Sequence, residues 1–74
     1  MRIIIKNMTG IETVIEVSPS ETINDGKKKY DGNIGRIWMF DGEILVGTKT
    51  FSYYEIDENE TIIATNKVIG GLNK

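Results

Sequence analysis

The chain has 74 residues, a formal net charge of -2 and a pI near 5.0, which predicts one small acidic domain. It contains no cysteine and no histidine, so disulfides, cysteine nucleophiles and histidine general bases or metal ligands are excluded. These properties argue against an enzyme, a metal or cofactor site and a nucleic-acid-binding protein, and the lack of a long apolar run argues against a membrane segment.

The N-terminal part predicts a β-hairpin. Segment 2–6 is rich in isoleucine, and segment 12–17 places its two glutamates on one face. The glycine-containing stretch 7–10 between them is typical of a turn, and we expect the isoleucines of both strands to face one core. Pro19 ends the second strand, because it has no backbone N–H to donate.

A short helix is expected next. Thr22 is the predicted N-cap, Asp25 occupies the capping-box position, and residues 31–33 end the helix after two to three turns. Gly26 weakens this helix by about 1 kcal/mol relative to alanine. The run Lys27–Lys29 is interpreted as the solvated side of the helix rather than as a nucleic-acid patch.

The remaining elements are strands and a packed loop. Strands are predicted at 36–40, 43–46 and 61–67, with an Asp41-Gly42 turn between the first two. Stretch 48–59 is expected to be a packed loop with a helical turn near its middle. This order predicts an α+β roll of the β-grasp type: a mixed sheet of four to five strands around one short helix, with the first and last strands parallel at its centre.

The core is expected to form from the inward-facing apolar residues of these elements. Its predicted members are Ile3, Ile5, Ile15, Val17, Ile23, Tyr30, Leu45, Phe51, Ile56, Ile62 and Ala64. Tyr54 is expected to reach a loop backbone through its hydroxyl group, since buried tyrosines usually satisfy that group.

Several segments resemble the ubiquitin-like family. Residues 1–10 and 16–23 are similar to the first half of ubiquitin, and residues 40–42, 50–56 and 60–62 are similar to its second half. Gly70-Gly71 falls where the family carries its diglycine, and only the region between the helix start and the third strand is shorter. The resemblance implies a ubiquitin-like domain at 1–67 and a flexible tail at 68–74.

The resemblance implies a protein modifier. A protease would remove residues 72–74, an activating enzyme would adenylate the Gly71 carboxylate, and enzyme thioesters would carry it to a lysine of a target protein. A diglycine suits this chemistry because residues without side chains can thread a narrow channel. The implied partners of the monomer are activating, conjugating and deconjugating enzymes, target proteins and ubiquitin-like receptors, in the cytoplasm or the nucleus.

The resemblance also implies site residues beyond the conjugated Gly70 and Gly71. The family's receptor-binding patch maps to Met8, Met39, Ile63 and Thr65, with Lys67 as the one cation kept before the diglycine. Lysines that could link chains are Lys6, Lys27 and Lys29, whereas the family's main linking positions hold Glu43 and Glu58.

Two alternatives remain open. The altered patch and the altered approach 66–69 also fit a ubiquitin-like interaction module that is never conjugated. Small β-grasp sulfur carriers likewise end in a diglycine, with the carboxylate converted to a thiocarboxylate, although this chain continues to Lys74.

One pair of departures from the family predicts a feature of the core. Gly26 and Trp38 stand where the family places aliphatic residues, on the helix and on the facing strand. Loss of a large aliphatic side chain would open a cavity and cost about 2–5 kcal/mol, and an indole is large enough to fill that space. Trp38 is therefore predicted to pack over Gly26.

Overall fold

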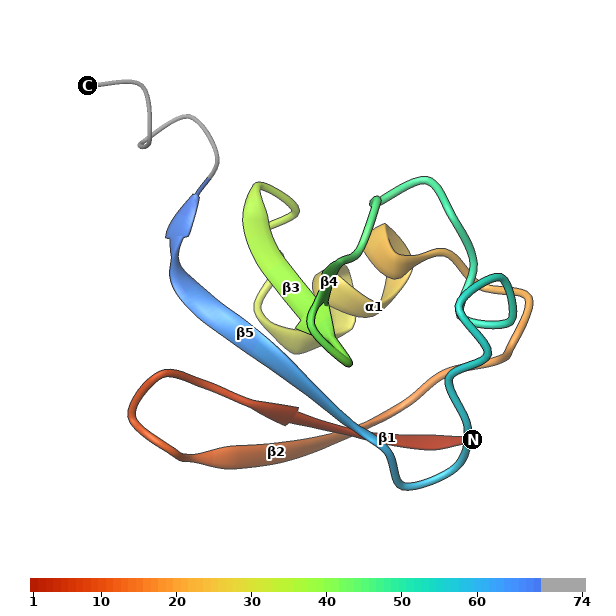
Figure 1. Cartoon of the computed structure of the whole chain (residues 1–74), viewed down its shortest axis with the longest axis horizontal. Coiled ribbons are helices and arrows are strands. Elements are labelled where there is room, and N and C mark those ends of the chain that lie inside the picture. Colours follow the sequence, from red (N-terminus) through yellow and green to blue (C-terminus); the bar gives the residue numbers. More distant parts are fainter. Residues whose placement is uncertain (69–74) are drawn as a thin grey trace.

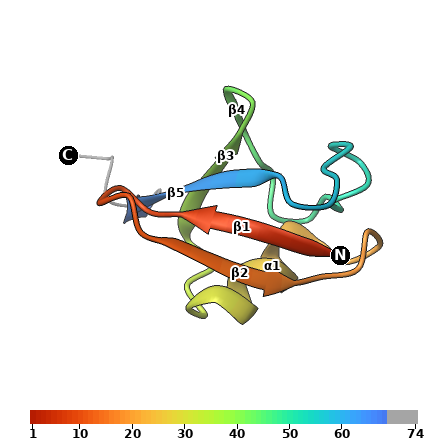
Figure 2. The ribbon, with the colours of Figure 1, turned by 90° about the horizontal axis from the view of Figure 1, so that it is seen from below.

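The computed structural model describes the backbone of residues 1–68 and the side chains of residues 1–65. Its elements are β1 (Arg2–Lys6), β2 (Glu12–Glu16), α1 (Ile23–Tyr30), β3 (Arg36–Phe40), β4 (Glu43–Ile44) and β5 (Thr61–Val68) (Figure 1). The sheet order is β2-β1-β5-β3-β4, with β1 and β5 parallel and the other neighbours antiparallel (Figure 2). The α+β class, the mixed sheet with one short helix and the central parallel pair are confirmed over this range.

The helix α1 begins at a reciprocal cap. The backbone N–H of Asp25 donates to Thr22 Oγ1 at 3.2 Å, and the backbone N–H of Thr22 donates to Asp25 Oδ2 at 3.0 Å, which is the predicted capping box. The Thr22 N–H also lowers the pKa of the Asp25 carboxyl. The eight residues of α1 match the expected two to three turns, and no helix within residues 1–68 is long and apolar enough to cross a membrane.

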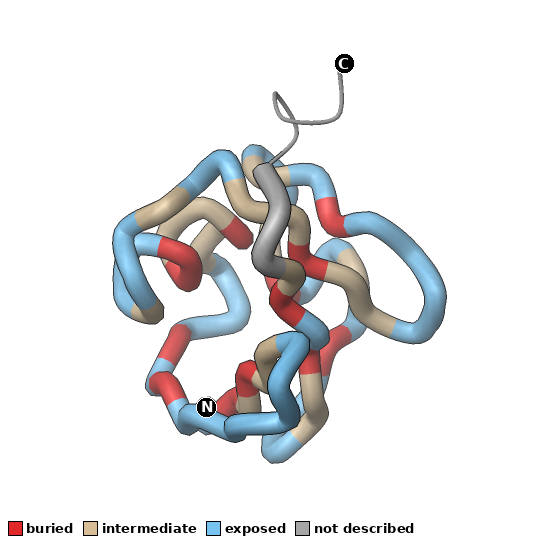
Figure 3. Tube along the Cα trace, turned by 90° about the vertical axis from the view of Figure 1, so that its left-hand side faces the viewer, coloured by how far each residue is buried: buried red, intermediate tan, exposed pale blue. Residues whose placement is uncertain are grey.

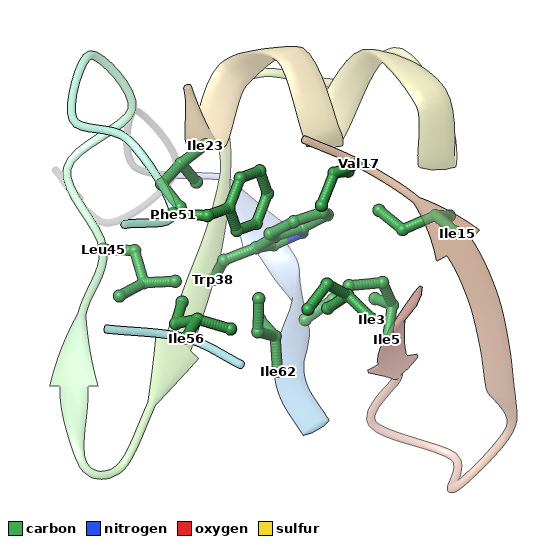
Figure 4. Close-up of a cluster of buried hydrophobic side chains, with 11 residues drawn as sticks. Ile3, Ile5, Ile15, Val17, Ile23, Trp38, Leu45, Phe51, Ile56 and Ile62 are labelled. Atoms are coloured by element: carbon green, nitrogen blue, oxygen red, sulfur yellow. The ribbon is translucent and has the colours of Figure 1, made fainter. Parts of the chain in front are cut away.

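An apolar core lies between α1 and the sheet, as the side chains in Figure 4 show, and Figure 3 colours the buried positions red along the chain. The buried members are Ile3, Ile5, Ile15, Val17, Ile23, Trp38, Leu45, Phe51, Ile56, Ile62 and Ala64. Every predicted core residue is buried except Tyr30, for which the prediction is wrong. Tyr30 is the last residue of α1, so it is only partly buried, and its ring packs edge-on against Trp38 with 6.0 Å between centroids.

Gly26 lets two aromatic rings approach the helix backbone. Trp38 is fully buried, and a Cβ atom placed on Gly26 would lie 3.3 Å from Trp38 Cζ3. The predicted packing of Trp38 over Gly26 is thus confirmed. Phe51 comes closer still, because the same Cβ would lie 2.7 Å from Phe51 Cζ. The rings together leave no room for a side chain at position 26.

The strand after the Asp41-Gly42 turn is shorter than predicted. β4 ends at Ile44, whereas the pattern predicted residues 43–46. The backbone N–H of Val46 donates to the Tyr54 hydroxyl at 2.7 Å, which confirms the role predicted for Tyr54. The backbone N–H of Leu45, one residue after β4, still donates to the Trp38 carbonyl oxygen of β3 at 2.9 Å.

The interpretation of Lys27 as part of a solvated helix side is wrong. Lys28 and Lys29 are exposed, but Lys27 keeps only 4 % of its surface accessible. Lys27 follows Ile23 by four residues, so both lie on the helix face that turns toward the core. Burial lowers the pKa of the Lys27 ammonium group.

Gly26→Ala tests the contact between the helix and the two rings. We expect a loss of about 1 kcal/mol in the free energy of unfolding, because the cost of overpacking exceeds the helix-propensity gain. Denaturant unfolding measures this difference, with Lys28→Ala as an exposed control on the same helix. A Gly26→Ala protein more stable than the parent would contradict the packing described above.

Candidate binding surface

The sheet carries a row of apolar residues on the side away from the core. Met39 on β3 pairs directly with Ile63 on β5 and with Ile44 on β4. Directly opposed residues point to the same side of a sheet, and successive residues alternate between sides. Their chain neighbours Trp38, Ile62 and Ala64 are buried, so the row faces outward. We call this side the outer face.

The outer face has a second apolar row beside the first. Ile4 on β1 pairs with Val14 on β2 and with Thr61 on β5. Val14 is 53 % exposed and Ile44 is 56 % exposed, which is unusual for large apolar residues within strands. The resemblance did not point to Ile4, Val14 or Ile44. Strand alternation could have found Ile4 and Val14, but placing Ile44 beside Met39 also needs the pairing register.

The predicted patch residues are brought together in part. Met39 and Ile63 are direct cross-strand partners, and Thr65 lies two residues beyond Ile63 on β5, where the pairing with β3 becomes irregular. Met8 is 60 % exposed in the turn after β1. This turn is stabilised by Asn7 Oδ1, which accepts hydrogen bonds from the backbone N–H groups of Thr9 and Ile11. Asn7 and Thr65 line the same small pocket as Tyr30 and Asp31 at the end of α1, so this turn lies near Thr65 but is not placed beside Met39 and Ile63.

The conjugation residues fall at the edge of what the structure describes. Gly70 and Gly71 lie outside the described residues, and so does the side chain of Lys67. The described backbone of β5 reaches Val68, which stands two residues before Gly70 in the sequence. The predicted tail therefore follows directly on the strand that carries Ile63 and Thr65.

The three predicted linking lysines have different surroundings. Lys6 is half-buried on the outer face, where it pairs with Ile63 and with Glu12. Lys29 Nζ donates to the Glu16 carbonyl oxygen at 2.8 Å and to Glu21 Oε1 at 2.9 Å. The Ser18 backbone N–H and then the Lys29 ammonium lower the pKa of the Glu21 carboxyl.

Lys27 differs from both because its side chain is buried, although it lines a pocket beside α1. Its Nζ donates to the Ile34 carbonyl oxygen at 3.3 Å, and no carboxylate among the described side chains lies within ion-pair distance of it. A buried ammonium group without a carboxylate is a destabilising arrangement.

The described residues offer surfaces for binding. Within residues 1–68 the acidic side chains do not gather into a group of three or more that could hold a metal ion. The outer face combines an apolar centre with charged residues at its border, which is a usual composition for a protein-binding surface. No family model matches the chain.

Lys27→Met tests whether the buried ammonium group destabilises the fold. We expect the free energy of unfolding at neutral pH to rise by about 1 kcal/mol, because methionine fills similar space without a charge to desolvate. The folded-state pKa of Lys27 is lowered, so the penalty is fully present below that pKa and vanishes above the unfolded-state pKa. The gain should therefore shrink as pH rises, whereas Lys28→Met should change stability little. A less stable Lys27→Met protein would show that Lys27 is well compensated.

Proposed function

We propose that the chain is a protein modifier of the ubiquitin-like family, with a β-grasp fold, joined to target lysines through Gly71. The observation that carries the proposal is the position of Gly70-Gly71 in the sequence, two residues after Val68, the last described residue of a mixed sheet with an apolar outer face. A tail that leaves a compact domain presents its carboxylate to an enzyme while the domain remains available for docking.

The chemistry follows from a carboxylate at Gly71. The carboxylate attacks the α-phosphate of ATP and releases pyrophosphate, and an enzyme thiolate then displaces AMP to form a thioester. A lysine amine attacks the thioester, the thiolate leaves, and an isopeptide bond remains. The chain has no cysteine or histidine, so the enzymes supply the nucleophile and the bases.

The outer face would dock the enzymes and receptors. Ile63 and Met39 are adjacent at its centre, and Lys6 and Glu12 continue the row to the edge strand β2. An interface of this kind gains affinity from its apolar centre and orientation from its charged border.

The second candidate is an interaction module that is never conjugated. The breadth of the outer face favours it, since Ile44, Ile4 and Val14 extend the apolar surface beyond the patch implied by the resemblance. Both candidates use the same face, and they differ only in whether Gly71 enters a covalent bond.

The Gly71→Ala variant separates the two candidates. We expect an N-terminally tagged chain in its native cells to give a ladder of heavier species that survives boiling in detergent. Gly71→Ala should abolish the ladder because a Cβ blocks the channel, while Lys74→Ala, within the removable extension, should leave it unchanged. No ladder at all, or a ladder that persists in Gly71→Ala, would rule out conjugation through Gly71.

Ile63→Glu tests the outer face within the same assay. We expect a drop of about tenfold or more in ladder intensity, because a charge at the interface centre must be desolvated on docking. Tyr53→Glu is the matched control, since Tyr53 is 62 % exposed on the loop before Ile56, away from the sheet. Circular dichroism checks that both variants fold. Equal ladders from the two variants would exclude the outer face from the reaction.

A further inference from the structure

A pocket of about 350 Å³ lies beside α1, and its lining includes none of the predicted patch residues Met8, Met39, Ile63 and Thr65. Asn24 and Lys27 of α1, Ile34 before β3, and the chain from Ile44 to Thr48 line it. The backbone N–H of Asn24 donates to the Gly47 carbonyl oxygen at 2.9 Å, which fastens the segment after β4 to the start of the helix (Figure 1). We call this pocket the Lys27 groove.

The floor of the Lys27 groove holds a buried cation without a buried anion. Lys27 is 4 % exposed, and among the described residues its Nζ has one hydrogen bond, to the Ile34 carbonyl oxygen at 3.3 Å. An ammonium group has three N–H donors, so two are left for a ligand. No aspartate or glutamate lines the groove, and the ion pairs among the described side chains do not include Lys27.

The rim of the Lys27 groove is aliphatic. Ile34, Ile44 and Val46 are each about half exposed, at 49 %, 56 % and 52 %. Gly47 lies in the wall, where a Cβ atom would collide with the side-chain amide of Asn24. The absence of a side chain at Gly47 therefore leaves space for the Asn24 amide, which can donate a second hydrogen bond to an acceptor in the groove.

We propose that the Lys27 groove binds an extended segment of a partner protein in which a glutamate or aspartate is flanked by aliphatic residues. The carboxylate accepts hydrogen bonds from Lys27 Nζ and the Asn24 amide, and the flanking side chains cover Ile34, Ile44 and Val46. Charge complementarity selects this occupant, because a buried cation that has no carboxylate partner among the described side chains is compensated by an anion that reaches it. The proposal does not depend on conjugation through Gly71.

The size of the pocket agrees with one side chain and its neighbours. Its volume lies at the lower end of the range for ligand pockets, which suits an amino-acid side chain better than a cofactor. Ile44 belongs both to the rim and to the outer face, so a partner seated on the outer face could extend over the edge strand β4 into the groove.

The test is an NMR titration of the full chain with defined peptides. The probes are acetyl-Gly-Leu-Glu-Leu-Gly-amide, the same peptide with glutamine in place of glutamate, and sodium acetate. We expect saturable shifts of the Asn24, Ile34 and Val46 amide signals, and about tenfold or more tighter binding of the glutamate peptide than of the glutamine peptide.

Variants make the outcome specific to Lys27. Lys27→Met should remove the preference for the glutamate peptide, whereas Lys28→Met should keep that preference. Val46→Asp should weaken the binding of the glutamate peptide although Lys27 is still present. Equal binding of the two peptides, shifts confined to other surfaces, or no saturable shift would overturn the proposal. If acetate binds as tightly as the glutamate peptide, the proposal of a peptide occupant is wrong, and the groove is a site for small carboxylates.

Discussion

The close approach of two aromatic rings to the helix backbone at Gly26 determines how α1 lies on the sheet. Trp38 comes from the middle of β3, and Phe51 comes from the loop before β5. The contact at Gly26 therefore joins the helix both to the sheet and to that loop. The Trp38 indole N–H is buried without a hydrogen-bond partner among the described residues, a cost of about 1–3 kcal/mol. The ring remains there because its volume fills the space that Gly26 leaves open.

The position of α1 in turn creates the two surfaces of interest. Because α1 and the core cover one side of the sheet, the other side is left as the outer face around Met39 and Ile63. The same docking of α1 buries Lys27 against the segment after β4 and forms the groove. The two surfaces adjoin at Ile44 on the edge strand, so one partner could contact both, or two partners could compete for that residue.

Features set by local sequence could be predicted, and features set by tertiary contacts could not. The hairpin, the Thr22–Asp25 cap and the Asp41-Gly42 turn depend on neighbouring residues, and all three are present. The burial of Lys27 depends on the segment that packs against it, and the Val46 N–H finds its partner in the Tyr54 hydroxyl, eight residues further along the chain. The same distinction holds for the candidate site. The resemblance indicated Met39 and Ile63, whereas the Lys27 groove is formed by three segments that no sequence motif connects.

The most direct measurement of the proposed function is mass spectrometry of tryptic peptides from native cells. Trypsin cleaves after Lys67, so a conjugated chain leaves residues 68–71, Val-Ile-Gly-Gly, on the ε-amine of a target lysine. The account predicts that this four-residue remnant is found on lysines of other proteins. Recovery of the C-terminal segment only as the intact peptide 68–74, with no remnant on any lysine, would contradict it.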